Sequence, residues 1–583
     1  MLRGIFHTKD LDSILAEAEG PQFSLRRALG AVNVTMLGIG AIIGAGIFTT
    51  VGTAAAGDAS RPGAGPSLML SFVITAVVCA FTALCYAELA SMVPISGSAY
   101  TYSYATLGEI IAWIIGWDLI IEYAVGNVAV AISWAGYFNA LLRSVGVDFP
   151  AWLATNYRTA SPEVLAAAPK IFDIPIVFNL LAFGIVMLIT AVLVWGIRES
   201  ATFNAAMVLI KVSVLLFFVV VALRHITPAE LVENWRPLQP NGWAGTLAGA
   251  AVVFFAYIGF DAVSTVAEET RNPARDLPIG IIASLVICTF IYIVVAATFT
   301  GIIPYEELRR LPPSSLSESL TLALQYRAPQ AAWQQTVVAI GAVVSTTAVL
   351  LVFQLGQPRI FFSMARDGLL PPSFARVHPK FRTPHVTTIV TGLIVGGVAG
   401  VASIDEMVDL TNIGTLFAFV LVCIGVIVLR FKEPNRARPF RVPFGPVLLP
   451  ALGAASCIFL MYYLPPASWW RFVGWLMLGL SIYTSYGYTR SGVGQRLGRP
   501  PRTPLTLKVA AFGFLLIALG LFLIPHDLSA KDLFSAFGRS AMAAVSSTEV
   551  ASRRTLLGGS MIAVGVLLAA IGVVSNRNGV RAK

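Results

Sequence analysis

Long apolar runs separated by short polar stretches dominate the chain from residue 31 to near its C-terminus. A helix needs roughly 20 apolar residues to cross a bilayer, and about fourteen runs are close to or above that length. The pattern therefore predicts an all-α polytopic membrane protein with about 14 transmembrane helices. The predicted spans are residues 31–56, 67–91, 107–141, 174–196, 201–224, 243–269, 278–302, 333–363, 386–402, 407–430, 444–464, 470–489, 505–525 and 555–574.

The first run is interrupted by a glycine-rich stretch, GIGAIIGAGIF, at residues 38–48. Non-helical backbone at membrane depth persists only where it lines a cavity or is buried in protein. Glycine also lets a ligand approach the main chain closely. Two interpretations stay open on this stretch alone: a broken helix whose main-chain groups bind a small ligand, or close helix packing through small residues.

The sixth run has a similar interruption, FFAYIGFD, at residues 254–261. Residues 31–224 and 243–430 each hold five predicted spans, and each half opens with an interrupted one. Because five is odd, the two halves have opposite orientations in the membrane. This pattern predicts a five-plus-five inverted-repeat transporter core with discontinuous helices 1 and 6, and it favours the broken-helix interpretation of the first run.

The repeat suggests three parts of the chain. They are a cytoplasmic N-terminal arm at 1–30, a ten-helix transport core at 31–430, and four additional helices with a C-terminal tail at 431–583. The last two spans are rich in small residues, which suggests a scaffold, or contacts with another copy or a small membrane partner. The pattern says little about the loop at 526–554.

Composition supports the membrane class, because 57% of residues are hydrophobic and only 12% are charged. A soluble domain has about 25% charged residues. The five cysteines all fall inside apolar runs, which argues against a disulfide framework or a metal cluster. The net charge of +10 does not require a nucleic acid partner, because membrane proteins concentrate Lys and Arg in cytoplasmic loops. Their distribution places both termini in the cytoplasm, with the protein in the cell (inner) membrane.

Several motifs resemble the amino acid–polyamine–organocation superfamily. They are residues 38–48, Tyr86 to Leu89 with Pro94, Gly97 and Tyr100, residues 254–278 (FFAYIGFDAVSTVAEETRNPARDLP) and residues 358–371 (PRIFFSMARDGLLP). The fourteen-span length, with Trp117-Asp118 and Glu122-Tyr123 in the third span, is most similar to the cationic amino acid transporter branch. One departure is Ala45, where such relatives often have Thr.

An amino acid needs partners for a carboxylate and for an ammonium group. The N-termini of half-helices offer free amides to a carboxylate, and unwound carbonyls suit an ammonium group. We assign the carboxylate to the amides of Gly44, Ala45 and Gly46, and the resemblance implies the same. The ammonium group is assigned to the carbonyls of Ile42 in the first break and of Phe255, Ala256 and Ile258 in the second. Ile43, between the two sets of groups in the first break, is a further substrate-binding candidate.

Lys211 lies about eleven residues from either end of the fifth run, which is about 16 Å of helix. An ionisable residue at that depth is expected to be functional, and burial favours its neutral form. In sodium-independent relatives a lysine in this span is thought to occupy the place of a coupling sodium ion. The resemblance thus implies a protonatable latch between Lys211, the first span and Ser345 and Thr346. A structural lysine paired with a carboxylate is the alternative.

Three further acidic residues lie in or near the apolar runs. Asp118 and Glu122 share a face of the third span, and Glu122 either recognises a cationic side chain and shapes the pocket, or is internally paired or protonated. Asp261 follows the second break, where an N-cap is more common than a ligand contact. Glu88 near the end of the second span is expected to contact a gate or loop.

Enzyme motifs are absent: the sequence has no GxSxG, no P-loop and no HExxH, so we expect neither catalysis nor a cofactor. The sequence favours a secondary amino acid permease working by alternating access, with proton-coupled, sodium-independent symport of cationic or small neutral amino acids. An exchanger without net proton coupling and a membrane amino acid sensor remain alternatives. The expected partners are the substrate, a proton and the lipid bilayer.

Overall fold

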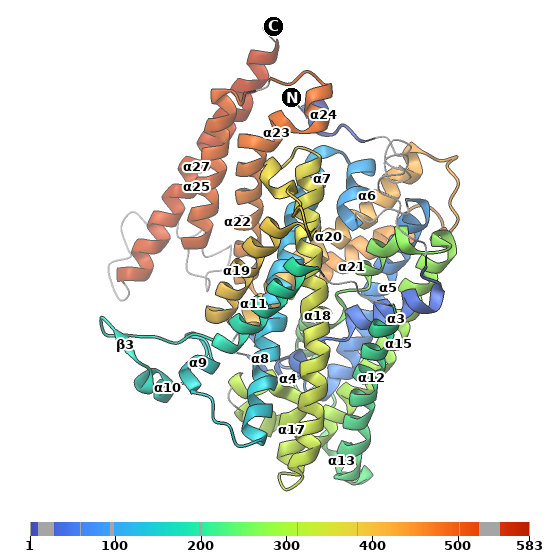
Figure 1. The fold of residues 1–583 in the computed structure, drawn as a ribbon, viewed down its shortest axis with the longest axis vertical. Coiled ribbons are helices and arrows are strands. Elements are labelled where there is room, and N and C mark those ends of the chain that lie inside the picture. Colours follow the sequence, from blue (N-terminus) through green and yellow to red (C-terminus); the bar gives the residue numbers. More distant parts are fainter. Residues whose placement is uncertain are drawn as a thin grey trace.

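The predicted apolar runs form helices that run mostly along one direction of the molecule (Figure 1). The computed structural model describes residues 2–9, 28–58, 60–93, 98–196, 201–311, 313–381, 383–500, 502–523 and 549–581. Most of the N-terminal arm predicted at 1–30, the motif residues Pro94 and Gly97, and most of the 526–554 loop lie outside these ranges.

Nine helices within the described residues are long and apolar enough to cross a membrane, or up to eleven if each of two bent pairs is one span. Leu180–Trp195 and His385–Val401 are shorter apolar helices. Each predicted span coincides with a helix or a group of consecutive helices. The prediction of an all-α polytopic membrane protein with discontinuous helices 1 and 6 is confirmed.

The first half of the chain contains the first broken helix. Its membrane helices are α3 (Ala31–Ile42), η1 (Gly46–Thr50), α4 (Val51–Ala56), α5 (Leu68–Met92), α7 (Glu109–Ile120), η3 (Ile121–Val125), α8 (Gly126–Ser144), α11 (Leu180–Trp195) and α12 (Ala201–Arg224). Short elements connect them: α1 (Leu2–Ile5), β1 (Gly57–Asp58), β2 (Arg61–Pro62), η2 (Gly65–Ser67), α6 (Ser98–Thr106), α9 (Ala151–Ala154), α10 (Pro162–Ala167), β3 (Lys170–Ile171), β4 (Ile174–Pro175) and α13 (Pro228–Asn234).

The second half of the chain contains the second broken helix. Its helices are α14 (Gly242–Val253), η4 (Phe254–Tyr257), η5 (Asp261–Glu269), α15 (Pro273–Ile302), α18 (Ala332–Arg366), α19 (His385–Val401) and α20 (Ile404–Lys432), with connecting α16 (Tyr305–Arg310), η6 (Pro313–Glu318), α17 (Ser319–Arg327) and η7 (Pro372–Ala375). The last part holds α21 (Leu448–Tyr462), α22 (Pro466–Ile482), η8 (Tyr483–Gly487), α23 (Tyr488–Arg490), α24 (Gly492–Arg496), α25 (Leu505–Leu523) and α27 (Glu549–Arg581).

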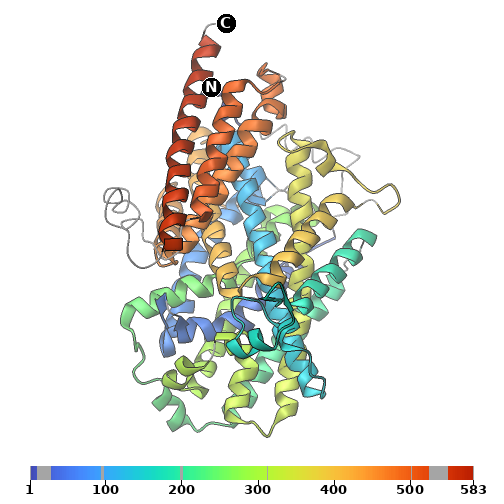
Figure 2. The same cartoon turned by 90° about the vertical axis from the view of Figure 1, so that its left-hand side faces the viewer.

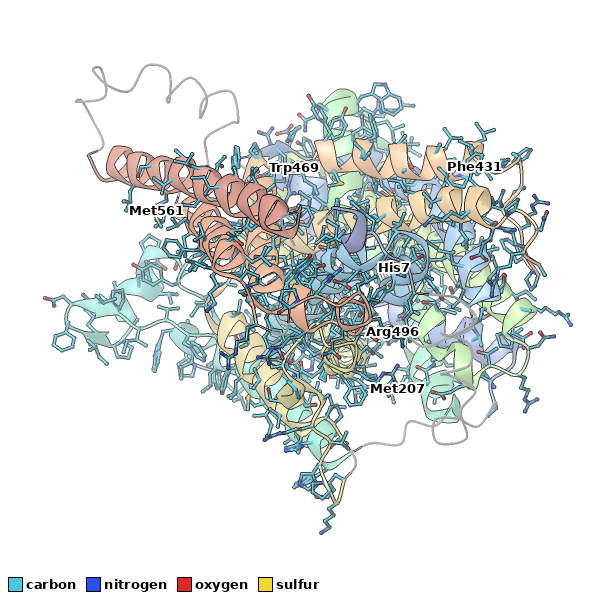
Figure 3. All side chains as sticks on the ribbon, turned by 90° about the horizontal axis from the view of Figure 1, so that it is seen from above. His7, Met207, Phe431, Trp469, Arg496 and Met561 are labelled. Carbon is cyan, nitrogen blue, oxygen red and sulfur yellow. The ribbon has the colours of Figure 1, made fainter. Side chains whose placement is uncertain are left out.

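Both termini lie at the same end of the helix bundle (Figures 1 and 2). We call it the terminal end; it carries residues 2–9, 107–109, 367–381 and 383–384. We call the other end the loop end; it carries residues 145–179, 303–311 and 313–331. Viewed from the terminal end, His7 lies near the middle of the bundle and Met561 on α27 lies at its periphery (Figure 3).

The fourth span is shorter than predicted, because α11 begins at Leu180 and not at residue 174. Residues 170–175 form a two-stranded hairpin, in which Lys170 pairs with Pro175. Its turn residues, Phe172 and Asp173, have positive φ angles of 50° and 61°. The apolar residues at 174–177 therefore belong to a connecting segment, although their composition continues that of the helix.

The small residues of the last two helices are used within the chain. A Cβ atom added to Gly513 of α25 would lie 2.4 Å from the backbone nitrogen of Ala569 in α27. One added to Gly520 would lie 2.5 Å from the Gly558 carbonyl oxygen. The two backbones therefore touch, which is how small residues pack membrane helices.

Glu109 ties the third span to the C-terminal helices at the terminal end. Its carboxylate is fully buried and accepts hydrogen bonds from the hydroxyls of Tyr483 and Ser491. The Arg499 guanidinium lies 2.7 Å away and also donates to the Gly4 carbonyl. These contacts position the helices after residue 466 against α7.

Candidate substrate site at two broken helices

The first break separates α3 from η1 at residues 43–45. Ile43 leaves the helix with φ −73° and ψ 101°, and the two halves are bent by 40°. Gly46 then begins η1. The first N–H groups of a helix have no carbonyl of a preceding turn to donate to. The N-terminus of η1 therefore offers free N–H groups together with the positive end of the helix dipole.

The second break follows η4, which ends at Tyr257. Ile258 is extended, with ψ 132°, and Gly259 has φ +121°, a conformation that side chains rarely adopt. A Cβ atom on Gly259 would also lie 2.8 Å from the backbone of Ala41, next to the first break. Glycine is therefore required here both by its backbone angle and by the close approach of α3.

The two breaks are in direct contact. A Cβ atom added to Gly46 would lie 2.3 Å from the Cα atom of Ala256. The structure thus brings together the predicted main-chain groups of both breaks, all of them on buried residues: Ile42, Ile43, Gly44, Ala45, Gly46, Phe255, Ala256 and Ile258. Glu122 is not part of this contact and lies beside Asp261 instead.

The carbonyl of Ile42 already has one donor. The hydroxyl of Tyr292 in α15 donates to it over 2.9 Å. This residue was not predicted, although a tyrosine inside an apolar span needs a polar partner, and that requirement was the available signal. A carbonyl oxygen has two lone pairs, so this hydrogen bond does not by itself prevent a second donor from binding.

Lys211 is completely buried in α12 and donates to the first break. Its Nζ atom lies 2.7 Å from the Gly40 carbonyl oxygen and 3.0 Å from that of Ile43. Among the described residues, no carboxylate forms a salt bridge with it. The carboxylate partner of the alternative interpretation is therefore not found in this part of the chain.

Ser345 and Thr346 in α18 behave differently, although they are adjacent. The Ser345 hydroxyl donates to the Ile43 carbonyl over 3.2 Å, and thus shares an acceptor with Lys211. The Thr346 hydroxyl bonds to the Ala342 carbonyl of its own helix. Ser345 therefore joins the lysine at the break, and Thr346 is satisfied within α18.

The acidic residues near the second break are buried together. The Glu122 carboxyl in η3 interacts electrostatically with those of Asp261 and Asp118. The N-cap role predicted for Asp261 is wrong: Asp261 is the first residue of η5 and caps nothing, and its Oδ1 atom accepts from the Gly259 N–H behind it. The reason is that the helix already starts after Phe260, one residue earlier than expected.

The loop end is closed over the first break by α17. The Ser319 hydroxyl donates to the Thr49 carbonyl over 2.7 Å and accepts from the Gly52 N–H at 3.0 Å. Tyr137 of α8 donates to the Phe48 carbonyl and accepts from the Leu320 N–H. The second half of the first broken helix, formed by η1 and α4, is thus held by α17 and by α8.

The terminal end is closed by main-chain contacts between the two broken segments. The N–H of Leu29 donates to the Glu269 carbonyl, and the N–H of Arg271 donates to the Leu29 carbonyl over 2.8 Å. Hydrogen bonds between separate segments therefore hold the first broken helix on both sides of its break.

The prediction that Glu88 contacts a loop is confirmed. Its carboxylate is 1% exposed and accepts from the Arg430 guanidinium and from the Val442 N–H, with Arg438 3.4 Å away. It joins α5 to α20 and to the connection after it.

Glu88→Gln should therefore destabilise the protein by about 3–5 kcal/mol, because it leaves the buried Arg430 charge without its anion. A thermal melt of the purified protein should show a clear fall in Tm. Glu433→Gln, which loses a partly exposed pair with Arg436 in the same connection, should leave Tm nearly unchanged. Equal Tm values for the two variants would contradict this assignment.

The fold and the paired breaks define an integral membrane protein with the architecture of a transporter. Residues 29–484 match the sequence model of the amino acid permease family, which is more than half of the chain. The chain belongs to this family, within the amino acid–polyamine–organocation superfamily, as its motifs predicted.

Three similar proteins are a permease and two transporters by name. The branched-chain amino acid permease BcaP of Bacillus subtilis is 44% identical over 495 residues, which is 85% of this chain and 100% of the relative. The methylthioribose transporter of the same organism is 41% identical over 84% of this chain and 99% of its own length. The vacuolar cationic amino acid transporter 4 of Arabidopsis thaliana is 37% identical over 74% and 68%.

Proposed function

We propose that the chain is a proton-coupled, sodium-independent symporter of amino acids that works by alternating access. The terminal end would face the cytoplasm, residues 31–430 would form the transport core, and residues 431–583 would surround it. The observation that carries the proposal is the buried Lys211 ammonium group, which bridges the Gly40 and Ile43 carbonyls where the first helix breaks.

The substrate would bind through main-chain groups. The N–H groups of Gly44, Ala45 and Gly46 would hold its carboxylate at the positive end of η1. Its ammonium group would take the carbonyls of Ile42, Phe255, Ala256 and Ile258. Because these contacts read only the shared part of an amino acid, substrate size and charge would be selected by neighbouring side chains, including Glu122.

The proton would act through Lys211. A protonated amine makes charge-assisted hydrogen bonds to the two carbonyls, which are roughly twice as strong as neutral ones. Loss of the proton would weaken the bridge between α12, α3 and Ser345 of α18 and let these helices separate. The same position would be filled by a cation in a sodium-coupled protein, so Lys211 would remove the need for sodium.

The substrate class rests on the relatives. The names of three similar proteins point to branched-chain amino acids, methylthioribose and cationic amino acids. We propose neutral or cationic amino acids, because the two breaks offer partners for both ends of a zwitterion. Methylthioribose has neither the ammonium group nor the carboxylate that the main-chain groups of the two breaks would bind.

Uptake into proteoliposomes tests the proposal. The panel should contain labelled leucine, valine, alanine, lysine, arginine and methylthioribose, each with and without an inward proton gradient. We expect uphill accumulation of at least one amino acid that collapses with a protonophore and persists when sodium is replaced by potassium.

Two outcomes would favour the rival functions. Movement only against internal amino acid, without effect of the proton gradient, would indicate an exchanger. Binding without any uptake would indicate a sensor. Uptake that requires sodium would contradict the role proposed for Lys211.

A further inference from the structure

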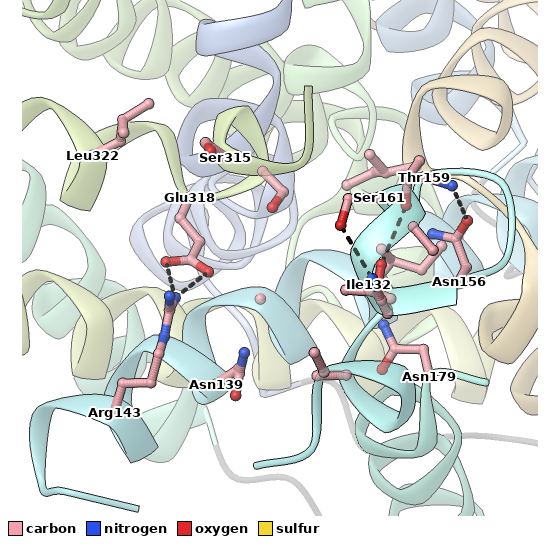
Figure 4. Close-up of a pocket in the computed structure, with 18 of the residues that line it drawn as sticks. Ile132, Asn139, Arg143, Asn156, Thr159, Ser161, Asn179, Ser315, Glu318 and Leu322 are labelled. Atoms are coloured by element: carbon pink, nitrogen blue, oxygen red, sulfur yellow. Dashed lines mark hydrogen bonds and ion pairs between the residues drawn. The ribbon is translucent and has the colours of Figure 1, made fainter. Parts of the chain in front are cut away.

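A cavity of about 370 Å³ lies at the loop end, on the outer side of the contacts that close the first broken helix. It is bordered by the end of α8, the segment with α9 and α10, the η6–α17 connection and the start of α20 (Figure 4). Its lining reaches Gly136, the neighbour of Tyr137, and Glu318, the neighbour of Ser319. Two lining residues are therefore adjacent in sequence to Tyr137 and Ser319, the residues whose side chains hold η1 and α4.

Glu318 is one of two carboxyl groups on the cavity wall. The Arg143 guanidinium donates to both of its oxygens, at 3.0 and 3.2 Å (Figure 4). Burial nevertheless raises the pKa of Glu318 to about 7, against the lowering effect of Arg143. The single, half-exposed arginine thus does not fully compensate this carboxyl group, and a second positive charge in the cavity would be favourable.

Asp405 is the second carboxyl group, in the first turn of α20. Salt bridges account for its acidic neighbours: Arg61 pairs with Asp58 and Asp409, and Arg471 pairs with Glu406. Within the described residues, no salt bridge or side-chain hydrogen bond is made by Asp405 itself. Arg61 also attracts the Asp405 carboxyl group electrostatically, but this arginine is shared with Asp58 and Asp409, so a further positive charge beside Asp405 would be favourable.

Four carboxamides line the cavity, those of Asn139, Asn156, Asn179 and Gln325. Asn156 and Asn179 are 4% and 3% exposed, and their Oδ1 atoms accept backbone N–H groups, from Thr159 and Ala182 respectively. Their Nδ2 groups remain as donors. The Oδ1 atom of Asn139 is buried without a hydrogen-bond partner, so it is an unused acceptor.

We propose that this cavity is a second amino acid site, in which Asp405, with Glu318 and Asn139, receives the ammonium group, and in which Arg143, Asn156 and Asn179 face the carboxylate. The ligand class rests on the proposed function, because amino acids are the substrates proposed there. In the proposed orientation the cavity is extracellular, and it holds a substrate before the outer contacts open.

Binding in the cavity can also affect the contacts that hold the first broken helix. Glu318 directly precedes Ser319, whose hydroxyl holds Thr49 and Gly52. An ammonium group that competes with Arg143 for Glu318 weakens the anchoring of α17 on α8. Occupation of the cavity thereby favours release of the outer half of the first broken helix.

Equilibrium binding of tritiated leucine, alanine and lysine to the full-length protein in nanodiscs tests the proposal. We expect close to two molecules of the bound amino acid per chain, and close to one for Asp405→Asn. In uptake, Asp405→Asn should raise KM at least fivefold with kcat changed less than twofold. Glu307→Gln, an exposed acidic residue that pairs with Arg310 at the same end, is the matched control and should leave both values unchanged.

Thiol protection gives a second readout that does not depend on stoichiometry. The five native cysteines are buried, so a cysteine placed at the exposed cavity residue Gln325 would be the reactive one. Amino acid should slow its modification by maleimide at least threefold, also in a Gly46→Ala background that lacks the central site, but not with Asp405→Asn.

The outcomes separate this inference from the proposed function. One bound molecule per chain, or unchanged protection in Asp405→Asn, would overturn the second site and leave the transporter intact. No binding or uptake of any amino acid by the unmodified protein would overturn both. Two molecules per chain, with one lost in Asp405→Asn, would establish the second site.

Discussion

Replacing Lys211 by methionine should abolish proton-driven accumulation of substrate, with a fall of about 100-fold or more in uphill uptake. The lysine donates two charge-assisted hydrogen bonds to the first break, and bonds of this kind contribute roughly 1.5–3 kcal/mol each. Two such bonds contribute about 3–6 kcal/mol in total. Since each 1.4 kcal/mol is a factor of ten, the lower end of this range already corresponds to a loss of roughly 100-fold. Methionine fills a similar volume, so the effect reports the charge and the donors and not a cavity.

The measurement is uptake into proteoliposomes with and without an inward proton gradient, with Tm recorded in parallel. Lys508→Met is the matched control, because Lys508 lies in α25 and is exposed. It should accumulate substrate as the unmodified protein does. If Lys211→Met still concentrates substrate with the same pH response, Lys211 does not carry the proton.

The membrane fold could be predicted from the sequence because apolar runs of about 20 residues are typical of transmembrane helices and rare in soluble domains. The breaks were also predictable, since Gly44, Gly46 and Gly259 interrupt runs that otherwise favour a helix. The depth of Lys211 in the fifth run made it a candidate for the same reason: an ionisable group there is costly unless it is used. Each of these predictions depends only on the residues of one segment and on the cost of placing polar groups in the bilayer.

Contacts between distant parts of the chain could not be predicted in this way. Ser319 is 270 positions from Thr49, and its sequence neighbourhood resembles that of any polar loop. Tyr292 meets Ile42 across 250 positions. Residues 174–179 were included in the fourth predicted span because Ile174, Ile176 and Val177 have the same hydropathy as residues of a membrane helix. Tertiary packing decided these positions, and a single sequence carries no record of which pairs meet.

Gly46→Ala should abolish high-affinity substrate binding, with a fall of at least tenfold in affinity and a matching loss of uptake. The added methyl group would lie 2.3 Å from the Cα atom and 2.8 Å from the nitrogen of Ala256, which are backbone atoms of the opposite break and cannot rotate away. Inserting a methyl group into such a contact costs typically 1–3 kcal/mol. The two breaks must therefore move apart, which separates the amides proposed for the carboxylate from the carbonyls proposed for the ammonium group.

Helix propensity predicts the opposite sign, and this makes the test decisive. Gly→Ala inside a helix normally stabilises it by about 1 kcal/mol. Gly184 in α11 has no atom within 4 Å of an added Cβ, so Gly184→Ala should keep or raise Tm and leave binding unchanged. Equilibrium binding of the labelled substrate, measured on both variants beside Tm, separates the two effects. Normal affinity in Gly46→Ala would mean that substrate does not bind where the two broken helices touch.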